Sequence, residues 1–205
     1  MPVLSGASGG DIAESLASIL GMDYVHLESR RFPDGEAYVK VPSEAIESLR
    51  SETVVLVSNT YPDSGIMQTV LLLGAINDVR RGDLSNLKGE GEQQMDDVGP
   101  GVILAIPYYG YARQDKRFSP GEAISARVIA DILAESCDGI VILDLHAPDV
   151  LEGMSLPIEF VSSMPEIADN LHNDVAPDFI LSPDKGAISR ASEVAGLIGC
   201  EFSYL

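Results

Sequence analysis

The chain has 205 residues, 45% of them hydrophobic, so it can bury a real core as one large domain or two small ones. Its 32 acidic and 13 basic residues give a formal net charge of −19, which argues against nucleic acid and anionic membrane surfaces as partners. An anionic substrate would therefore need a local basic patch.

Two cysteines, Cys137 and Cys200, lie in apolar stretches without CxxC or metal-ligand spacing, which favours a reduced, cytoplasmic chain. No run approaches the roughly eighteen apolar residues of a membrane span. The start MPVLSGASGG lacks the basic region of a signal peptide. We therefore expect a soluble, cytoplasmic protein that is not bound to a membrane.

Short apolar runs alternate with longer stretches of helical spacing along the chain. The runs predict strands at Pro2–Leu4, Tyr24–Leu27, Val54–Val57, Val102–Ile106, Ile140–Leu143 and Phe179–Leu181. Helices are predicted at Asp11–Leu20, Ile66–Val79, Ile124–Leu133, Ile167–Leu171 and Ala187–Ile198. This alternation predicts an α/β fold with a mainly parallel sheet flanked by helices. Ligands of such folds bind beyond the carboxyl ends of the strands.

The interval from Arg80 to Gly101, RRGDLSNLKGEGEQQMDDVGPG, is polar and lacks a clear pattern. We interpret it as a long, mobile surface loop. A first domain is predicted over residues 1–160. The remaining residues 161–205 have room for only one or two strand–helix units, so we interpret them as the start of an incomplete second domain.

The densest group of cations follows the predicted strand Val102–Ile106. There the sequence PYYGYARQDKRF places Arg113, Lys116 and Arg117 within five residues. Guanidinium groups grip phosphate oxygens bidentately, so this turn is a candidate polyphosphate cradle. A solvated basic turn explains the spacing equally well, and Tyr108, Tyr109 and Tyr111 could pack in the core or contact a ligand.

Two further strands end in polar residues. Asp144 and His146 follow Ile140–Leu143 and could hold or orient a metal, although a lone histidine is more often a packed residue. Asp184, in the run Ser182–Gly186, could be an ordinary helix cap or part of a magnesium and anion site. Three such turns on one sheet edge favour the functional interpretation.

The segment RFPDGE, from Arg31 to Glu36, is first of all a β-turn signal, because Pro-Asp-Gly favours a tight turn. The turn alone leaves one feature unexplained: the aromatic Phe32 is followed by the carboxylates of Asp34 and Glu36. Such a group can stack on a purine and accept hydrogen bonds from its exocyclic amine.

Taken together, six segments in register resemble ribose-phosphate diphosphokinase, also called phosphoribosyl-pyrophosphate synthetase, over nearly the whole chain. They are SGASGGDIAESLA, RRFPDGE, IPYYGYARQDKRF, ISARVIADIL, ILDLHAP and LSPDKGAISRA, and SPDKGA is similar to the archaeal branch. The resemblance implies two similar domains of the type I phosphoribosyltransferase kind, assembled as a homodimer or larger ring. The active site would then lie between the domains, near a subunit contact.

The resemblance also implies roles for individual residues. Phe32, Asp34 and Glu36 would bind adenine from a neighbouring subunit, and Arg113 and Gln114 would hold ATP and its phosphates. His146 and Asp184 would be the metal-associated residues, with Mg²⁺ as cofactor. The implied reaction transfers the β,γ-diphosphate of ATP to ribose 5-phosphate, which gives phosphoribosyl diphosphate and AMP for nucleotide biosynthesis.

Two elements of the family are missing from the sequence up to Leu205: the catalytic Lys and Arg loop, and the acidic loop that holds ribose 5-phosphate. No catalytic residue is therefore assigned. We expect this chain to bind Mg-ATP but to turn over ribose 5-phosphate poorly or not at all. One alternative is a non-catalytic regulatory homologue that binds catalytic subunits. A phosphoribosyltransferase ranks last, because that class also needs the acidic loop.

Overall fold

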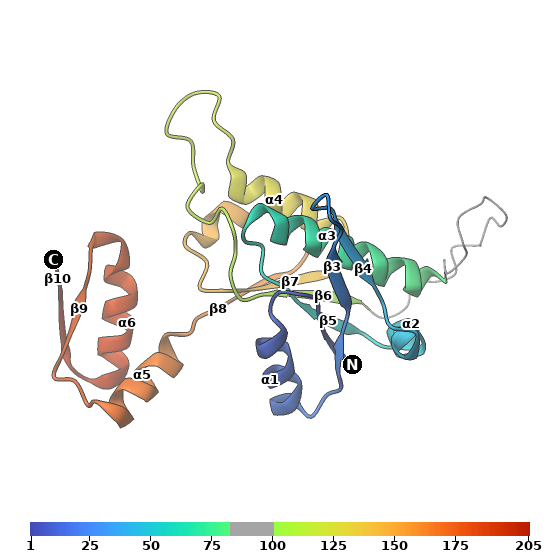
Figure 1. Cartoon of the computed structure of the whole chain (residues 1–205). Helices are drawn as coiled ribbons and strands as arrows, with labels where there is room; N and C mark the ends of the chain where they lie inside the picture. Colours follow the sequence, from blue (N-terminus) through green and yellow to red (C-terminus); the bar gives the residue numbers. More distant parts are fainter. Residues whose placement is uncertain (83–100) are drawn as a thin grey trace. The chain divides into compact units, whose positions relative to one another are not determined.

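The computed structural model describes residues 1–82 and 101–205 (Figure 1). These residues form two compact units, Met1–Phe160 and Val161–Leu205. Nearly all of the interval that we predicted to be a surface loop lies outside the described residues. No helix of the described residues is long and apolar enough to cross a membrane.

The first unit contains a six-stranded sheet with the order β2-β1-β5-β6-β7-β8. Strand β1 pairs in parallel with β2 and β5, β5 pairs with β6, and β6 pairs with β7. This confirms the predicted α/β fold with a mainly parallel sheet. The strands are β1 (Val3–Ser5), β2 (Tyr24–His26), β5 (Val54–Val57), β6 (Val102–Ile106), β7 (Gly139–Leu143) and β8 (Ile158–Val161).

Helices cover both faces of this sheet, and the alternation of side chains along the strands decides which helix each residue meets. On one face, Leu4 and Leu56 pack in a cluster with residues of α2 (Ile46–Ser51), α3 (Asp63–Arg81) and α4 (Ser125–Ala134). On the other face, Val55 and Val57 pack with Ala13 and Ala17 of α1 (Gly10–Leu20). Figure 1 shows α1 on the side of the sheet opposite to α3 and α4.

A separate antiparallel hairpin joins β3 (Glu28–Arg31) to β4 (Ala37–Lys40), in register from Glu28 opposite Lys40 to Arg31 opposite Ala37. A short 3₁₀ turn, η1 (Ser43–Ala45), leads into α2, and another, η2 (Pro148–Leu151), follows β7. The turn of the hairpin is the predicted Pro-Asp-Gly turn, closed by a 2.9 Å bond from the Gly35 N–H to the Phe32 carbonyl.

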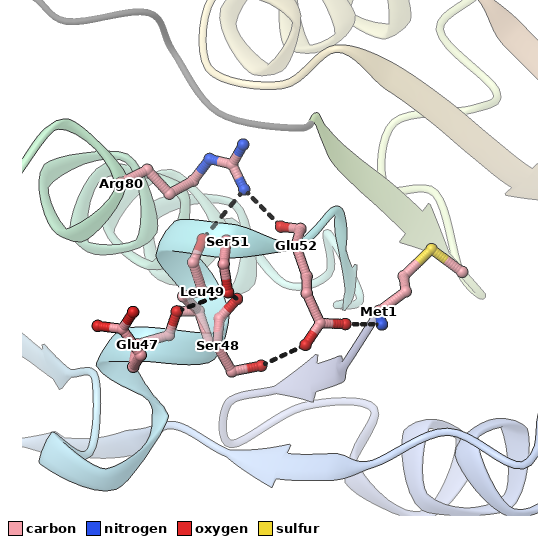
Figure 2. Close-up of polar contacts among 7 residues, drawn as sticks. All are labelled: Met1, Glu47, Ser48, Leu49, Ser51, Glu52 and Arg80. Atoms are coloured by element: carbon pink, nitrogen blue, oxygen red, sulfur yellow. Dashed lines mark hydrogen bonds and ion pairs between the residues drawn. The ribbon is translucent and has the colours of Figure 1, made fainter.

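Arg80 corrects the predicted start of the surface loop, because this residue belongs to helix α3 and is only 6% exposed. Its Nη1 donates to the carbonyl oxygens of Leu49, at 3.3 Å, and Glu52, at 3.0 Å, at the end of α2 (Figure 2). Burial lowers the pKa of Arg80, and the Asp138 carboxylate opposes that shift. The buried guanidinium therefore ties the end of α3 to the end of α2.

The second unit is small. It consists of α5 (Met164–Asp174), β9 (Phe179–Ser182), η3 (Lys185–Ala187), α6 (Ile188–Ile198) and β10 (Glu201–Tyr204), and the two strands pair in parallel. Its buried cluster is formed by Met164, Ala168 and Val194. Phe179, Leu181 and Phe202 remain exposed on the strands.

Candidate functional site

The candidate site begins at residues 107–114, here called the post-β6 loop because they follow β6 directly. Tyr109 points into the core: it is 4% exposed, and its hydroxyl donates to the Ala126 carbonyl at 2.7 Å. Burial raises the pKa of Tyr109 well above its ordinary value. Tyr108 and Tyr111 are instead 58% and 37% exposed. The three tyrosines therefore divide between one packing residue and two that solvent or a ligand can reach.

Arg113 and Gln114 lie at the end of the post-β6 loop with exposed side chains. The Gln114 N–H donates to the Tyr111 carbonyl at 2.9 Å, and the Ala126 N–H donates to the Gln114 carbonyl at 3.3 Å. The Ser125 hydroxyl donates to Gln114 Oε1. Gln114 is thus fixed against the start of α4, and Arg113 stands next to it.

The other two cations of the predicted cradle have partners nearby. Arg117 Nε donates to the Glu122 carbonyl at 2.8 Å, and Lys116 Nζ lies 5.5 Å from the centre of the Phe118 ring. No hydrogen bond or ion pair of the Arg113 side chain occurs within residues 1–82 and 101–205. An open groove of about 390 Å³ lies beside this turn and is lined by Gln114, Lys116, Phe118, Glu122, Ala123 and Ser125. Lys116 is thus the cation of this group that lines the groove, and Arg113 is exposed beside Gln114.

The hairpin turn presents Phe32, Asp34 and Glu36 to solvent. The Arg30 guanidinium carbon lies 4.8 Å from the centre of the Phe32 ring, and Tyr38 meets that ring edge-on at 5.8 Å between centroids. Asp34 Oδ1 accepts the Glu36 N–H at 3.1 Å. These contacts fix the ring while leaving it 39% exposed, as a stacking surface requires. No hydrogen bond or ion pair among the described residues joins this turn to Arg113 or Gln114.

The metal candidates lie in different units, and Asp184 follows β9 of a separate two-stranded sheet, so the prediction that all three turns share one sheet edge is wrong. His146 follows β7 in the first unit and is exposed. Asp184 belongs to the second unit, where its Oδ1 accepts the Ala187 N–H at 3.0 Å and caps η3. Of the two interpretations left open for Asp184, the structure therefore shows the helix cap.

Within residues 1–82 and 101–205, no three His, Cys, Asp or Glu side chains are grouped so as to hold a metal ion. Magnesium often keeps several waters and binds through substrate phosphates plus one or two carboxylates. A site of that kind needs few protein ligands, and His146 and Asp184 are each exposed to solvent within their own unit.

The residues that follow β5, residues 58–62, were not predicted from the sequence to belong to the site; they are here called the post-β5 loop. Asn59 and Thr60 of this loop, and Asp63 at the start of α3, hydrogen-bond to the post-β6 loop. The signal was present, because SNTYPD follows the buried run Val54–Val57 at the same carboxyl edge of the sheet. Small polar residues after a strand resemble an ordinary turn, so residue type alone does not distinguish this segment.

Comparison with known proteins yields one family. Residues 1–81 and 100–136 match the N-terminal domain of ribose phosphate pyrophosphokinase. The unmatched residues 82–99 fall within the interval that the sequence analysis singled out as a loop. The solved structure of phosphoribosylpyrophosphate synthetase from Mycobacterium smegmatis is similar in fold, with a TM-score of 0.76 and 22% identity. The similarity covers 98% of this chain and 62% of that one.

Two curated relatives show the same relationship at the level of sequence. The ribose-phosphate pyrophosphokinase of Methanothermobacter thermautotrophicus is 35% identical over 196 residues, which is 95% of this chain and 61% of the relative. That of Saccharolobus solfataricus is 34% identical over 208 residues, 100% of this chain and 64% of the relative. The chain thus spans less than two thirds of the length of these relatives. On these matches, the chain belongs to the ribose-phosphate pyrophosphokinase family.

Proposed function

We propose that this chain supplies the ATP-binding part of a ribose-phosphate diphosphokinase. That enzyme transfers the β,γ-diphosphate of ATP to the anomeric hydroxyl of ribose 5-phosphate and releases AMP. The observation that carries the proposal is the post-β6 loop, where Arg113 and Gln114 are exposed just beyond a buried parallel strand. Ligands of open parallel sheets bind at this edge.

Arg113 would bind the phosphate oxygens of ATP. A planar guanidinium offers paired N–H donors that match two phosphate oxygens at once. Negative charge spreads over those oxygens as the diphosphate is transferred, so the cation stabilises the transition state more than the bound substrate. Because hydrogen bonds already fix the neighbouring Gln114, ATP binding would cost little conformational entropy for ordering this part of the loop.

The hairpin turn would recognise adenine. Phe32 offers a partly exposed ring for stacking, and the carboxylates of Asp34 and Glu36 can accept hydrogen bonds from the exocyclic amine. As the family resemblance implies, we assign this turn to the site of a neighbouring copy. The protein would then be a homodimer or a larger homo-oligomer.

Mg²⁺ would accompany ATP. His146 follows β7, which is paired with β6, so its imidazole lies at the same edge of the sheet as the post-β6 loop. Asp184, exposed within the second unit, is a further candidate metal ligand, as the family resemblance implies. When bound, the metal neutralises charge on the triphosphate and orients it for in-line transfer.

Calorimetric titration with Mg-ATP tests this proposal. We expect the wild-type chain to bind and Arg113→Gln to bind about 10- to 100-fold more weakly, because a hydrogen bond to a charged group contributes about 1.5–3 kcal/mol. Arg50→Gln is the matched control, since Arg50 is an exposed arginine on α2 and the change in charge is the same. Chelation of Mg²⁺ by EDTA should also weaken binding.

Two results would contradict the proposal: no binding of Mg-ATP by the wild-type chain, or equal losses in the two arginine variants. Release of AMP that depends on ribose 5-phosphate measures the chemistry separately from binding. Analytical ultracentrifugation tests the proposed oligomer.

A further inference from the structure

The post-β5 loop holds the post-β6 loop by a series of hydrogen bonds. The Tyr108 N–H donates to Asn59 Oδ1 at 3.0 Å, and the Thr60 N–H donates to the Tyr108 carbonyl at 3.1 Å. The Gly110 N–H donates to Thr60 Oγ1 at 2.8 Å. The Thr60 hydroxyl donates in turn to the Tyr108 carbonyl, at 3.4 Å. Both hydrogen-bond donors of Thr60, the backbone N–H and the hydroxyl, thus bind the neighbouring loop.

Burial makes the Thr60 contacts costly to lose. Thr60 is 0% exposed and Gly110 is buried as well, so water cannot replace a missing hydroxyl without rearrangement. The two backbones are also in close contact, because a Cβ on Gly110 would lie 2.0 Å from the Thr60 carbonyl oxygen. The geometry therefore requires a hydroxyl at position 60 and a hydrogen in place of a side chain at position 110.

A second contact fixes the loop further along. The Tyr111 hydroxyl donates to Asp63 Oδ1 at 2.6 Å. Tyr111 has a backbone φ of +62°, a left-handed conformation that is unfavourable for a bulky residue unless its surroundings hold it. Its carbonyl accepts the Gln114 N–H. Asp63 thus acts on the backbone that leads directly to Arg113.

We propose that Thr60 and Asp63 are positioning residues for ATP binding: they hold the post-β6 loop in the shape that presents Arg113 and Gln114. The claim that the ligand is ATP rests on the proposed function. The geometric part, that Thr60 and Asp63 hold the shape of the post-β6 loop, does not. Neither residue needs to touch the nucleotide. Thr60 acts through Gly110 and Tyr108, and Asp63 acts through Tyr111.

Matched substitutions of threonine test the role of Thr60. Thr60→Val keeps the shape of the side chain and removes the hydroxyl, whereas Thr60→Ser keeps the hydroxyl. Thr53→Val makes the same chemical change just before β5, at the opposite end of that strand. Hydrogen–deuterium exchange of residues 107–115 reports the order of the loop, and calorimetry reports the affinity for Mg-ATP.

We expect Thr60→Val to speed exchange in residues 107–115 by roughly tenfold and to weaken Mg-ATP binding by about three- to tenfold, as loss of a buried hydrogen bond predicts. Thr60→Ser and Thr53→Val should stay within about twofold of wild type in both measurements. Tyr111→Phe, which removes an exposed hydroxyl, should speed exchange in the same segment and provides the test if Thr60→Val does not fold.

Unchanged exchange in residues 107–115 in both Thr60→Val and Tyr111→Phe would overturn the geometric part. Faster exchange with unchanged Mg-ATP affinity would overturn the link to ATP, provided that Arg113→Gln weakens binding as expected. If the wild-type chain binds no Mg-ATP, the proposed function and the link to ATP both fail, and exchange alone still decides the geometric part.

Discussion

Replacing Gly110 with alanine tests how tightly the two loops at the carboxyl edge of the sheet are packed. The added Cβ would lie 2.0 Å from the Thr60 carbonyl oxygen and 3.0 Å from its carbonyl carbon. Both atoms belong to the backbone of a buried residue, so relief requires one of the two loops to move. Overpacking of this kind costs typically 1–3 kcal/mol. For a chain of this length, a cost of about 2 kcal/mol lowers Tm by roughly 4–8 °C.

Thermal unfolding followed by far-UV circular dichroism measures this effect. The matched control is Gly74→Ala in helix α3, where a Cβ would meet nothing within 4 Å. There alanine should raise the unfolding free energy by about 0.5–1 kcal/mol, because glycine is a poor helix former. A Tm for Gly110→Ala equal to or above that of wild type would refute the packing that we describe.

Three further predictions concern other buried or hydrogen-bonded groups. Arg80→Met should lower the unfolding free energy by about 2 kcal/mol, because it leaves the carbonyls of Leu49 and Glu52 without their charged donor; urea unfolding measures this. The hydrogen bond to Asp63 raises the pKa of Tyr111 in the folded protein. This hydrogen bond therefore contributes its full stability below the ordinary tyrosine pKa, and the contribution is lost as pH rises through the pKa of Tyr111 in the folded protein. The stability difference between wild type and Tyr111→Phe should therefore shrink between pH 8 and pH 11. Burial raises the pKa of Cys137 to about 11, so little reactive thiolate forms at pH 8. Iodoacetamide at pH 8 should therefore leave Cys137 of the folded protein mostly unmodified over the time in which a denatured sample reacts fully. Equal alkylation rates of Cys137 in the folded and denatured protein would contradict this.

The sequence was sufficient for most of the parallel sheet. Runs such as Val54–Val57 and Val102–Ile106 are apolar on both faces because helices cover both sides, and their predicted bounds agree with the structure. Strand β3 has the sequence ESRR, so no hydrophobic pattern indicates it. Its strand conformation depends on pairing with β4, which a search for apolar runs cannot detect. Strand β10, EFSY, was missed because it is exposed throughout.

Residue type alone predicted only part of the candidate site. The cations after β6 and the Pro-Asp-Gly turn were identified because charge and turn chemistry are visible in the sequence. Thr60 and Asp63 were not, since their contribution is a set of contacts with a loop about 50 residues away along the chain. Arg80 was assigned to a loop because it begins a polar run without a clear pattern; its contacts with the carbonyls of Leu49 and Glu52 explain its buried place in the helix.

The central claim is that ATP phosphates bind at the post-β6 loop, and nuclear magnetic resonance tests it most directly. Amide chemical shifts of the ¹⁵N-labelled chain would be followed during titration with Mg-ATP. We predict that the largest changes occur in residues 107–115, with smaller ones in 144–146 and little change in α1. Changes confined to residues 161–205, or centred on α1, would contradict the claim.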